Sequence, residues 1–190
     1  MVVEKCYQKL NLNWPDILKD WEKTTGLCKQ ESGIHNRWNV PFEQVRPDFI
    51  EFCKSLELTV IQICMFHTHL FNNRHLIHID DSSIGDFAKL NWVYGSNNAD
   101  MVWYELKDGH SMTIMDRPDG SLHYTARDKD VNEICRTQID ANPTIVKTGI
   151  LHTAINHSGE DRFVCQVWLA KNNKPCTFNE LVEIFKDYII

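Results

Sequence analysis

The chain has 190 residues and a formal net charge of −6, with 43% hydrophobic and 24% charged residues. This balance excludes a disordered chain, and the length predicts one domain that buries roughly 70% of its unfolded surface. The acidic total disfavours nucleic acid or an anionic membrane as a partner, although it would not reveal a local basic groove.

The opening residues, MVVEKCYQKLNLNWPD, lack the basic start and the continuous apolar run of a signal peptide. No apolar run in the sequence has the length needed to span a bilayer. Seven cysteines stand singly, without a C-x-x-C pair. We therefore expect reduced, mostly structural thiols and a cytoplasmic protein.

Two helices are expected before the first strong strand. Pro15 is suited to the first turn of a helix that Gly26 can end, with apolar residues on one face between them. Pro47 starts a second apolar stripe at helical spacing, which runs to Leu56. We expect the first helix to cover one sheet and the apolar stripe of the second to lie in the core.

From Leu58 the pattern changes to short runs rich in β-branched and aromatic residues, which predict strands. Thr177 and Glu180 then form a capping box at the start of a C-terminal helix. About eight strands with flanking helices predict a mainly β fold whose core is a double-stranded β-helix, the cupin-like jelly roll. The predicted strands are 58–66, 74–80, 87–94, 101–106, a hairpin of 111–116 and 121–126, 144–155, and 162–170.

The predicted domain covers residues 1–190 as one unit. Residues 1–57 form a helical N-terminal support, residues 58–169 form the jelly-roll core, and residues 177–190 contain the C-terminal helix. A β-sandwich without a functional site is the alternative architecture.

A candidate metal site lies in the stretch RHLIHIDD, residues 74–81. On a strand, His78 and Asp80 point to the same face and can offer an imidazole nitrogen and a carboxylate oxygen to one metal ion. His152, in another apolar run, is the candidate third ligand. Two histidines and one carboxylate with open positions opposite suit non-haem Fe(II).

A histidine two residues before an acid arises by chance in a chain of this composition, so the motif needs support from elsewhere. Asn156 lies four residues after His152 and Arg162 lies ten residues after it, at the start of the last strong strand. If a 2-oxo acid chelates the metal, its far carboxylate needs a cation, and an arginine can bind it in a bidentate manner. The alternative for Arg162 is a salt bridge to an acid at the sheet edge.

This order of H-x-D, distal His, Asn and Arg resembles the Fe(II)- and 2-oxoglutarate-dependent oxygenases over residues 58–169, especially their small single-domain members from bacteria and phages. The resemblance implies Fe(II), the co-substrate 2-oxoglutarate and a hydroxylase activity. The expected location is the cytoplasm, which is the host's cytoplasm if the protein is encoded by a phage. It implies His78, Asp80 and His152 as iron ligands. The cofactor-binding residues that it implies are Arg162, Asn91 and Asn156.

The chain departs from the family at Val164, where many members carry Ser or Thr two residues after the arginine. One hydrogen bond to the co-substrate carboxylate is then missing or comes from another side chain. His67 and His69 also share a strand face, so either could replace a proposed ligand.

The sequence does not decide whether the substrate is a peptidyl residue or a small metabolite, and it disfavours nucleic acid. It does not decide the oligomeric state. The rim of the substrate site is expected to include the loop from Gly95 to Asp100 and the hairpin around Asp119. Aromatic residues are candidate walls, although a place in the core is the alternative: Trp92, Trp103 and Tyr104. Two other functions stay open, a non-catalytic jelly-roll binding module and a cupin-like metalloenzyme that uses Zn, Mn or Fe without 2-oxoglutarate.

Overall fold

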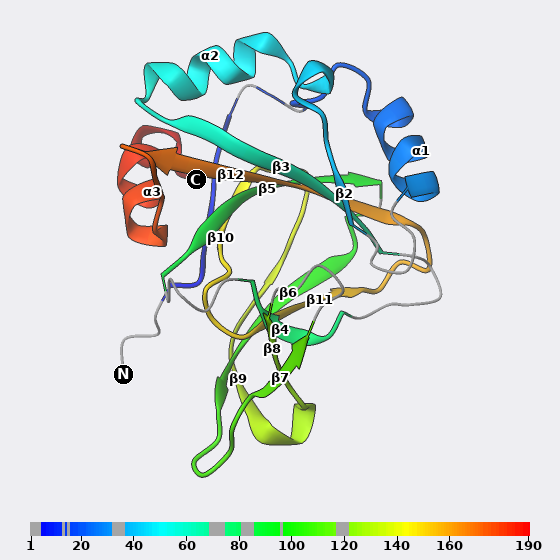
Figure 1. The fold of residues 1–190 in the computed structure, drawn as a ribbon, viewed down its shortest axis with the longest axis vertical. Coiled ribbons are helices and arrows are strands. Elements are labelled where there is room, and N and C mark those ends of the chain that lie inside the picture. The colour runs from blue at the N-terminus through cyan, green and yellow to red at the C-terminus, as the bar shows by residue number, and fades with distance from the viewer. Residues whose placement is uncertain are drawn as a thin grey trace.

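Two antiparallel β-sheets face each other, and helices cover the outer side of the larger one (Figure 1). The computed structural model describes residues 5–12, 14, 16–31, 37–68, 75–80, 86–95, 97–116 and 122–190. The expected mainly β architecture with flanking helices and a jelly-roll core is confirmed.

The described part of the chain contains thirteen strands. They are β1 (Tyr7–Lys9), β2 (Arg37–Asn39), β3 (Thr59–Thr68), β4 (Ile77–Ile79), β5 (Ala88–Gly95), β6 (Ala99–Leu106), β7 (Thr113–Asp116), β8 (Leu122–Ala126), β9 (Val131–Gln138), β10 (Thr144–Lys147), β11 (His152–Asn156), β12 (Arg162–Lys171) and β13 (Lys174–Pro175). The helices are α1 (Trp21–Glu31), α2 (Pro47–Ser55) and α3 (Phe178–Ile184), with short 3-10 turns η2 (Phe42–Gln44), η3 (Asp128–Asp130) and η4 (Lys186–Tyr188).

The larger sheet has the strand order β1-β10-β5-β12-β3-β2, with β13 beside β12, and the smaller sheet has the order β7-β8-β4-β11-β6-β9. The hairpin expected from residues 111–116 and 121–126 is present as β7 paired with β8, while its turn at 117–120, including Asp119, lies outside the described residues. Because β12 lies between β3 and β5, segments roughly 70 to 110 residues apart in sequence become neighbours.

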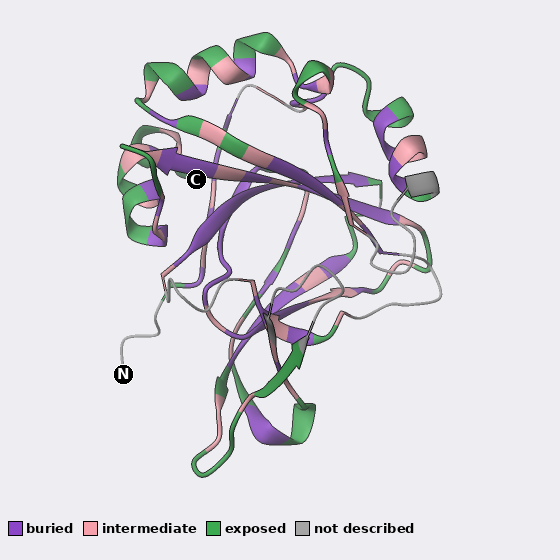
Figure 2. Cartoon of the chain, in the orientation of Figure 1, coloured by how far each residue is buried: buried purple, intermediate pink, exposed green. Residues whose placement is uncertain are grey.

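Alternation along β5 separates two environments. Leu90 and Trp92 belong to the cluster under the helices, whereas Lys89, Asn91 and Val93 point to the other face of the sheet. The strand is buried on both faces up to its last residue, and β5 is accordingly purple in Figure 2. The space between the two sheets is therefore partly polar, and the candidate site lies there.

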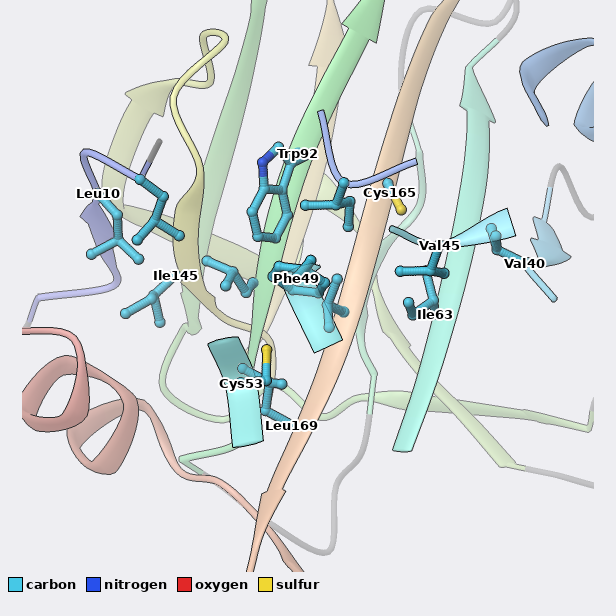
Figure 3. Packing of buried hydrophobic residues seen from close by; sticks show 14 of the residues in the cluster. Leu10, Val40, Val45, Phe49, Cys53, Ile63, Trp92, Ile145, Cys165 and Leu169 are labelled. Carbon is cyan, nitrogen blue, oxygen red and sulfur yellow. The ribbon is translucent and has the colours of Figure 1, made fainter. Parts of the chain in front are cut away.

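The largest apolar cluster anchors the helices to the outer face of the larger sheet. Phe49 and Cys53 of α2 are fully buried and point towards Trp92 of β5 and Leu169 of β12 (Figure 3). The Phe49 and Trp92 rings meet edge to face, with centroids 5.3 Å apart. This packing on the outer face fixes the positions of β5 and β12. Their inner faces, which point towards the smaller sheet, can therefore carry polar groups.

Helix α1 is displaced from the predicted position. The predicted helix ran from Pro15, which is outside the described residues, to Gly26, but α1 begins at Trp21 and passes through Gly26 to Glu31. The Asp16 carboxylate accepts a hydrogen bond from the Leu18 amide at 2.7 Å and forms a turn instead. Asp20 accepts from the Lys23 amide at 2.9 Å, which places the helix start after Asp20.

The single strand predicted for residues 144–155 is also wrong, because it is divided into β10 and β11 in different sheets. The amides of Thr148 and Gly149 both donate to the Phe87 carbonyl, at 2.8 and 3.0 Å, where the chain crosses between the sheets. The predicted capping box of Thr177 and Glu180 is present at the start of α3. No helix in the described ranges is long and apolar enough to cross a membrane.

We predict that Phe49→Ala lowers the free energy of unfolding by about 3–5 kcal/mol, because it removes a fully buried ring and leaves a cavity beside Trp92. The matched control is Phe42→Ala, which removes a ring that is 50% exposed and should change the free energy by no more than about 0.5 kcal/mol. Urea denaturation measures both. Equal losses in the two variants would contradict the packing described above.

Candidate metal centre

Three potential metal ligands meet between the two sheets. β4 pairs with β11 in a register that places His78 directly opposite His152, and the two rings have centroids 4.6 Å apart. Asp80 lies two residues after His78 and points to the same side. One ligand atom from each residue lies within 4.8 Å of the others. The structure thus brings together the three residues that the sequence proposed as ligands.

Backbone carbonyls orient both imidazoles in the same way. Nδ1 of His78 lies 2.8 Å from the Leu76 carbonyl oxygen, and Nδ1 of His152 lies 2.8 Å from the Ile150 carbonyl oxygen. A carbonyl can only accept, so each Nδ1 carries a proton and donates. Each Nε2 then presents its lone pair to the space shared with Asp80, which is the arrangement that fixes histidine ligands in metal sites.

The spacing of the donor atoms suits a bound cation. Nε2 of His78 lies 3.1 Å from Oδ1 of Asp80, and both atoms are acceptors when Nδ1 holds the imidazole proton. Two ligands at right angles around a divalent metal with bonds of ~2.1 Å lie roughly 3.0 Å apart, so this spacing suits a shared ion. Oδ2 of Asp80 lies 3.9 Å from Nε2 of His152. The residues present therefore fit a divalent metal.

Burial controls the charges in this group. Burial and the neighbouring His78 lower the pKa of His152 to about 4, so this imidazole is neutral at pH 7, as a metal ligand must be. Burial opposes ionisation of Asp80, but Lys89 and the two histidines outweigh it and hold the Asp80 pKa well below its usual range. Nζ of Lys89 lies 2.6 Å from Oδ2 of Asp80.

Arg162 is a buried cation that no described carboxylate neutralises. It is 3% exposed, its Nε has no hydrogen-bond partner among the described residues, and burial lowers its pKa to about 10. It occupies the face of β12 that also carries Val164 and Gln166, and Gln166 accepts a hydrogen bond from Lys89. Arg162 therefore faces the same interior as the metal ligands. The alternative of a salt bridge at the sheet edge is not seen among the described residues.

Two residues near Arg162 were not predicted from the sequence to belong to the site. Thr68 of β3 lies directly opposite Arg162, is 3% exposed, and has its Oγ1 2.8 Å from Nε2 of His75. Burial is the main cause that lowers the His75 pKa to about 4, and the charges of His78 and Arg162 add to it. The register of β3 with β12 is needed to identify Thr68 as a site residue. His75 could have been identified from the sequence, because it lies in the same stretch as His78 and Asp80.

Asn91 and Asn156 occupy different environments. Asn91 lies on the interior face of β5 and is 3% exposed, and its Oδ1 has no hydrogen-bond partner in the part of the chain that the structure describes. Asn156 donates to the Glu160 carbonyl at 2.7 Å and accepts from the Ser158 hydroxyl at 2.7 Å. The side chain of Asn156 thus shapes the turn that leads from β11 to Arg162. For both residues, a role in cofactor binding stays a prediction.

The rival ligand His67 points away from the metal group. Its ring stacks on Phe163 with centroids 4.7 Å apart, and its Nε2 lies 3.1 Å from Oδ1 of Asp161. Phe163 belongs to the cluster beneath the helices, so His67 is on the outer face of the larger sheet. His69 lies outside the described residues. The aromatic residues proposed as substrate walls are all in apolar core clusters: Trp92, Trp103 and Tyr104.

Several solved structures are similar to this chain at low sequence identity. They include AviO1 from Streptomyces viridochromogenes, with 11% identity, a TM-score of 0.48, and coverage of 92% of this chain and 94% of that chain. A prolyl-4-hydroxylase from Pseudomonas putida has 10% identity, a TM-score of 0.43, and coverage of 88% and 92%. The viral collagen prolyl hydroxylase of Paramecium Bursaria Chlorella virus-1 has 10% identity, a TM-score of 0.40, and coverage of 88% and 91%. No protein-family model and no curated protein matches the sequence.

We predict that His75 makes the metal-free protein less stable in acid. Its pKa is about 4 in the folded chain against an ordinary value of 6.5, so the unfolded chain takes up the proton first as the pH falls. Above pH 6.5 His75 is neutral in both states and costs nothing, and between pH 6.5 and pH 4 the free energy of unfolding falls by about 3 kcal/mol. His75→Gln, which cannot titrate, should show a smaller fall in unfolding free energy over this range. Urea denaturation at several pH values measures it, and identical pH profiles would contradict the assignment.

Proposed function

We propose that the protein is an Fe(II)- and 2-oxoglutarate-dependent oxygenase that hydroxylates its substrate. The observation that carries this proposal is the pairing of a His78–Asp80–His152 group with a buried arginine that no described carboxylate neutralises, in one interior between two sheets. A metal ion and a dicarboxylate are the ligands that satisfy both features at once. A metal alone would not account for the buried arginine, and a dicarboxylate alone would not account for the ligand group.

In the proposed enzyme, Nε2 of His78, Nε2 of His152 and one oxygen of Asp80 hold the iron. The carbonyls of Leu76 and Ile150 keep both imidazoles in the ligating orientation through their Nδ1 protons. Bound Fe(II) would supply the activation of dioxygen, coupled to oxidative decarboxylation of 2-oxoglutarate and hydroxylation of a C–H bond. The chain's own part is to leave positions open for the co-substrate and dioxygen, because the group found among the described residues supplies three protein ligands.

The far carboxylate of 2-oxoglutarate is proposed to bind Arg162. A guanidinium forms two parallel hydrogen bonds to a carboxylate, and the anion would remove the cost of the buried charge. Val164 cannot supply the hydroxyl that many similar oxygenases have at that position. We propose Thr68 in its place, because it lies directly opposite Arg162 on the neighbouring strand and carries a hydroxyl oriented by His75.

Apolar side chains between the sheets would exclude water from the reaction. Val93, Met101, Trp103 and Val164 form one cluster from both sheets, and all four are less than 9% exposed. Their low polarity strengthens the hydrogen bonds and charge interactions of the neighbouring site. We propose a peptidyl residue or a small metabolite as the substrate, in a single-domain cytoplasmic enzyme.

We predict that Mn(II), used anaerobically in place of Fe(II), raises the melting temperature only together with 2-oxoglutarate. A ligand at a hundred times its dissociation constant adds about 2.7 kcal/mol, which in a chain of this size corresponds to roughly 5–10 °C. A thermal melt with each component alone and with both together measures the effect. A shift with metal alone favours the cupin-like metalloenzyme, and no shift in any condition favours a non-catalytic binding module.

We predict that two single variants separate the two halves of the site. His152→Ala should abolish Mn(II) binding because it removes one of three ligands, whereas Arg162→Ala should keep the metal and weaken 2-oxoglutarate binding at least tenfold. Isothermal titration of each variant with metal, and then with 2-oxoglutarate, makes the distinction. Full metal affinity in the His152 variant would overturn the ligand assignment.

A further inference from the structure

A buried lysine contacts the carboxylate of the candidate metal centre. Lys89 of β5 is 2% exposed, and its Nζ lies 2.6 Å from Oδ2 of Asp80 and 3.1 Å from Oε1 of Gln166. The ammonium also lies 4.3 Å from the centre of the Trp168 ring, where the face of the indole attracts a cation. These contacts hold the lysine charge beside the ligand group, where water cannot screen it.

The two oxygens of Asp80 are divided between different partners. Oδ1 lies 3.1 Å from Nε2 of His78, whereas Oδ2 lies next to Lys89. The contact with Lys89 reserves Oδ2, so Oδ1 is the oxygen available to a metal. A carboxylate that binds through one oxygen occupies one position, which leaves more of the coordination sphere open.

The lysine also changes the charge of the centre. Two neutral imidazoles and one carboxylate would reduce the charge of a divalent ion by one unit, but the ammonium of Lys89 cancels the charge of Asp80. A metal bound to His78, Asp80 and His152 therefore keeps an uncompensated double positive charge in a buried site. Such a site favours an anion as the next ligand and disfavours the metal alone.

We propose that the charge of Lys89 couples metal binding to anion binding, so that a divalent metal binds tightly only together with a 2-oxo acid dianion. This inference rests on the proposed function, because it concerns the same metal centre. Lys89 acts through Asp80 and is a positioning residue. By thermodynamic linkage, the factor by which the dianion strengthens metal binding equals the factor by which the metal strengthens dianion binding.

The expected size follows from Coulomb's law. A unit charge held within ~5 Å of a divalent ion changes the ion's affinity by roughly tenfold even at the dielectric constant of bulk water, and by more in a buried site. For the unaltered protein we expect 2-oxoglutarate to tighten Mn(II) binding by a factor of about 5 to 150, the usual range for coupled sites.

The test measures Mn(II) affinity from the electron paramagnetic resonance signal of the free ion, with and without 2-oxoglutarate. Lys89→Gln removes the charge and keeps an amide that can donate to Asp80, while Lys89→Met removes both the charge and the donor. The matched control is Lys147→Met, because Lys147 is also buried and its Nζ lies 2.8 Å from Oδ1 of Asp86, outside the metal group.

Both Lys89 variants should bind Mn(II) alone at least tenfold more tightly than the unaltered protein, and 2-oxoglutarate should strengthen that binding by a correspondingly smaller factor. The Lys147 variant should keep the unaltered ratio. Weaker Mn(II) binding, or an unchanged ratio, in Lys89→Gln would overturn the inference, and this variant decides the question if Lys89→Met does not fold. Absence of Mn(II) binding by the unaltered protein in both conditions would instead overturn the proposed function, and the inference with it.

Discussion

The antiparallel pairing of β4 with β11 is the constraint on which the candidate site depends. Backbone hydrogen bonds flank the histidine pair on both sides: the Asp80 amide donates to the Thr148 carbonyl at 3.0 Å, and the His75 amide donates to the Ala154 carbonyl at 3.1 Å. A shift of one residue in either strand would turn one of the two histidines out of the interior. Two short strands of three and five residues therefore determine whether three side chains can share one ion.

The interior between the sheets holds more charge than packing alone would favour. Asp80, Lys89 and Arg162 all lie there, although apolar residues of similar size often make a core equally stable or more stable. Asp80 and Lys89 neutralise each other, whereas Arg162 has no described counter-charge. We interpret this as stability given up for ligand binding, a trade that is common where a site needs charges held in advance.

Features set by local chemistry could be predicted from the sequence, and features set by distant pairing could not. The capping box of α3 depends on Thr177 and Glu180 alone, and the alternation of a strand places His78 and Asp80 on one face without any knowledge of the neighbouring strands. Strand β9 was missed because its polar residues face solvent and weaken the apolar pattern. The contacts of Thr68 and Lys89 depend on strand register, on which single-sequence patterns carry no information.

The central place of β12 has a consequence for synthesis of the chain. β3 and β5 each pair with β12, which is the last long strand in sequence order, and β12 joins them into one sheet. A nascent chain therefore exposes two long, apolar strands with unsatisfied edges until residues 162–171 have left the ribosome. Because translation adds about 5–20 residues per second, this interval lasts several seconds. We expect the protein to need chaperone protection during that time and to aggregate when translation stalls before Arg162.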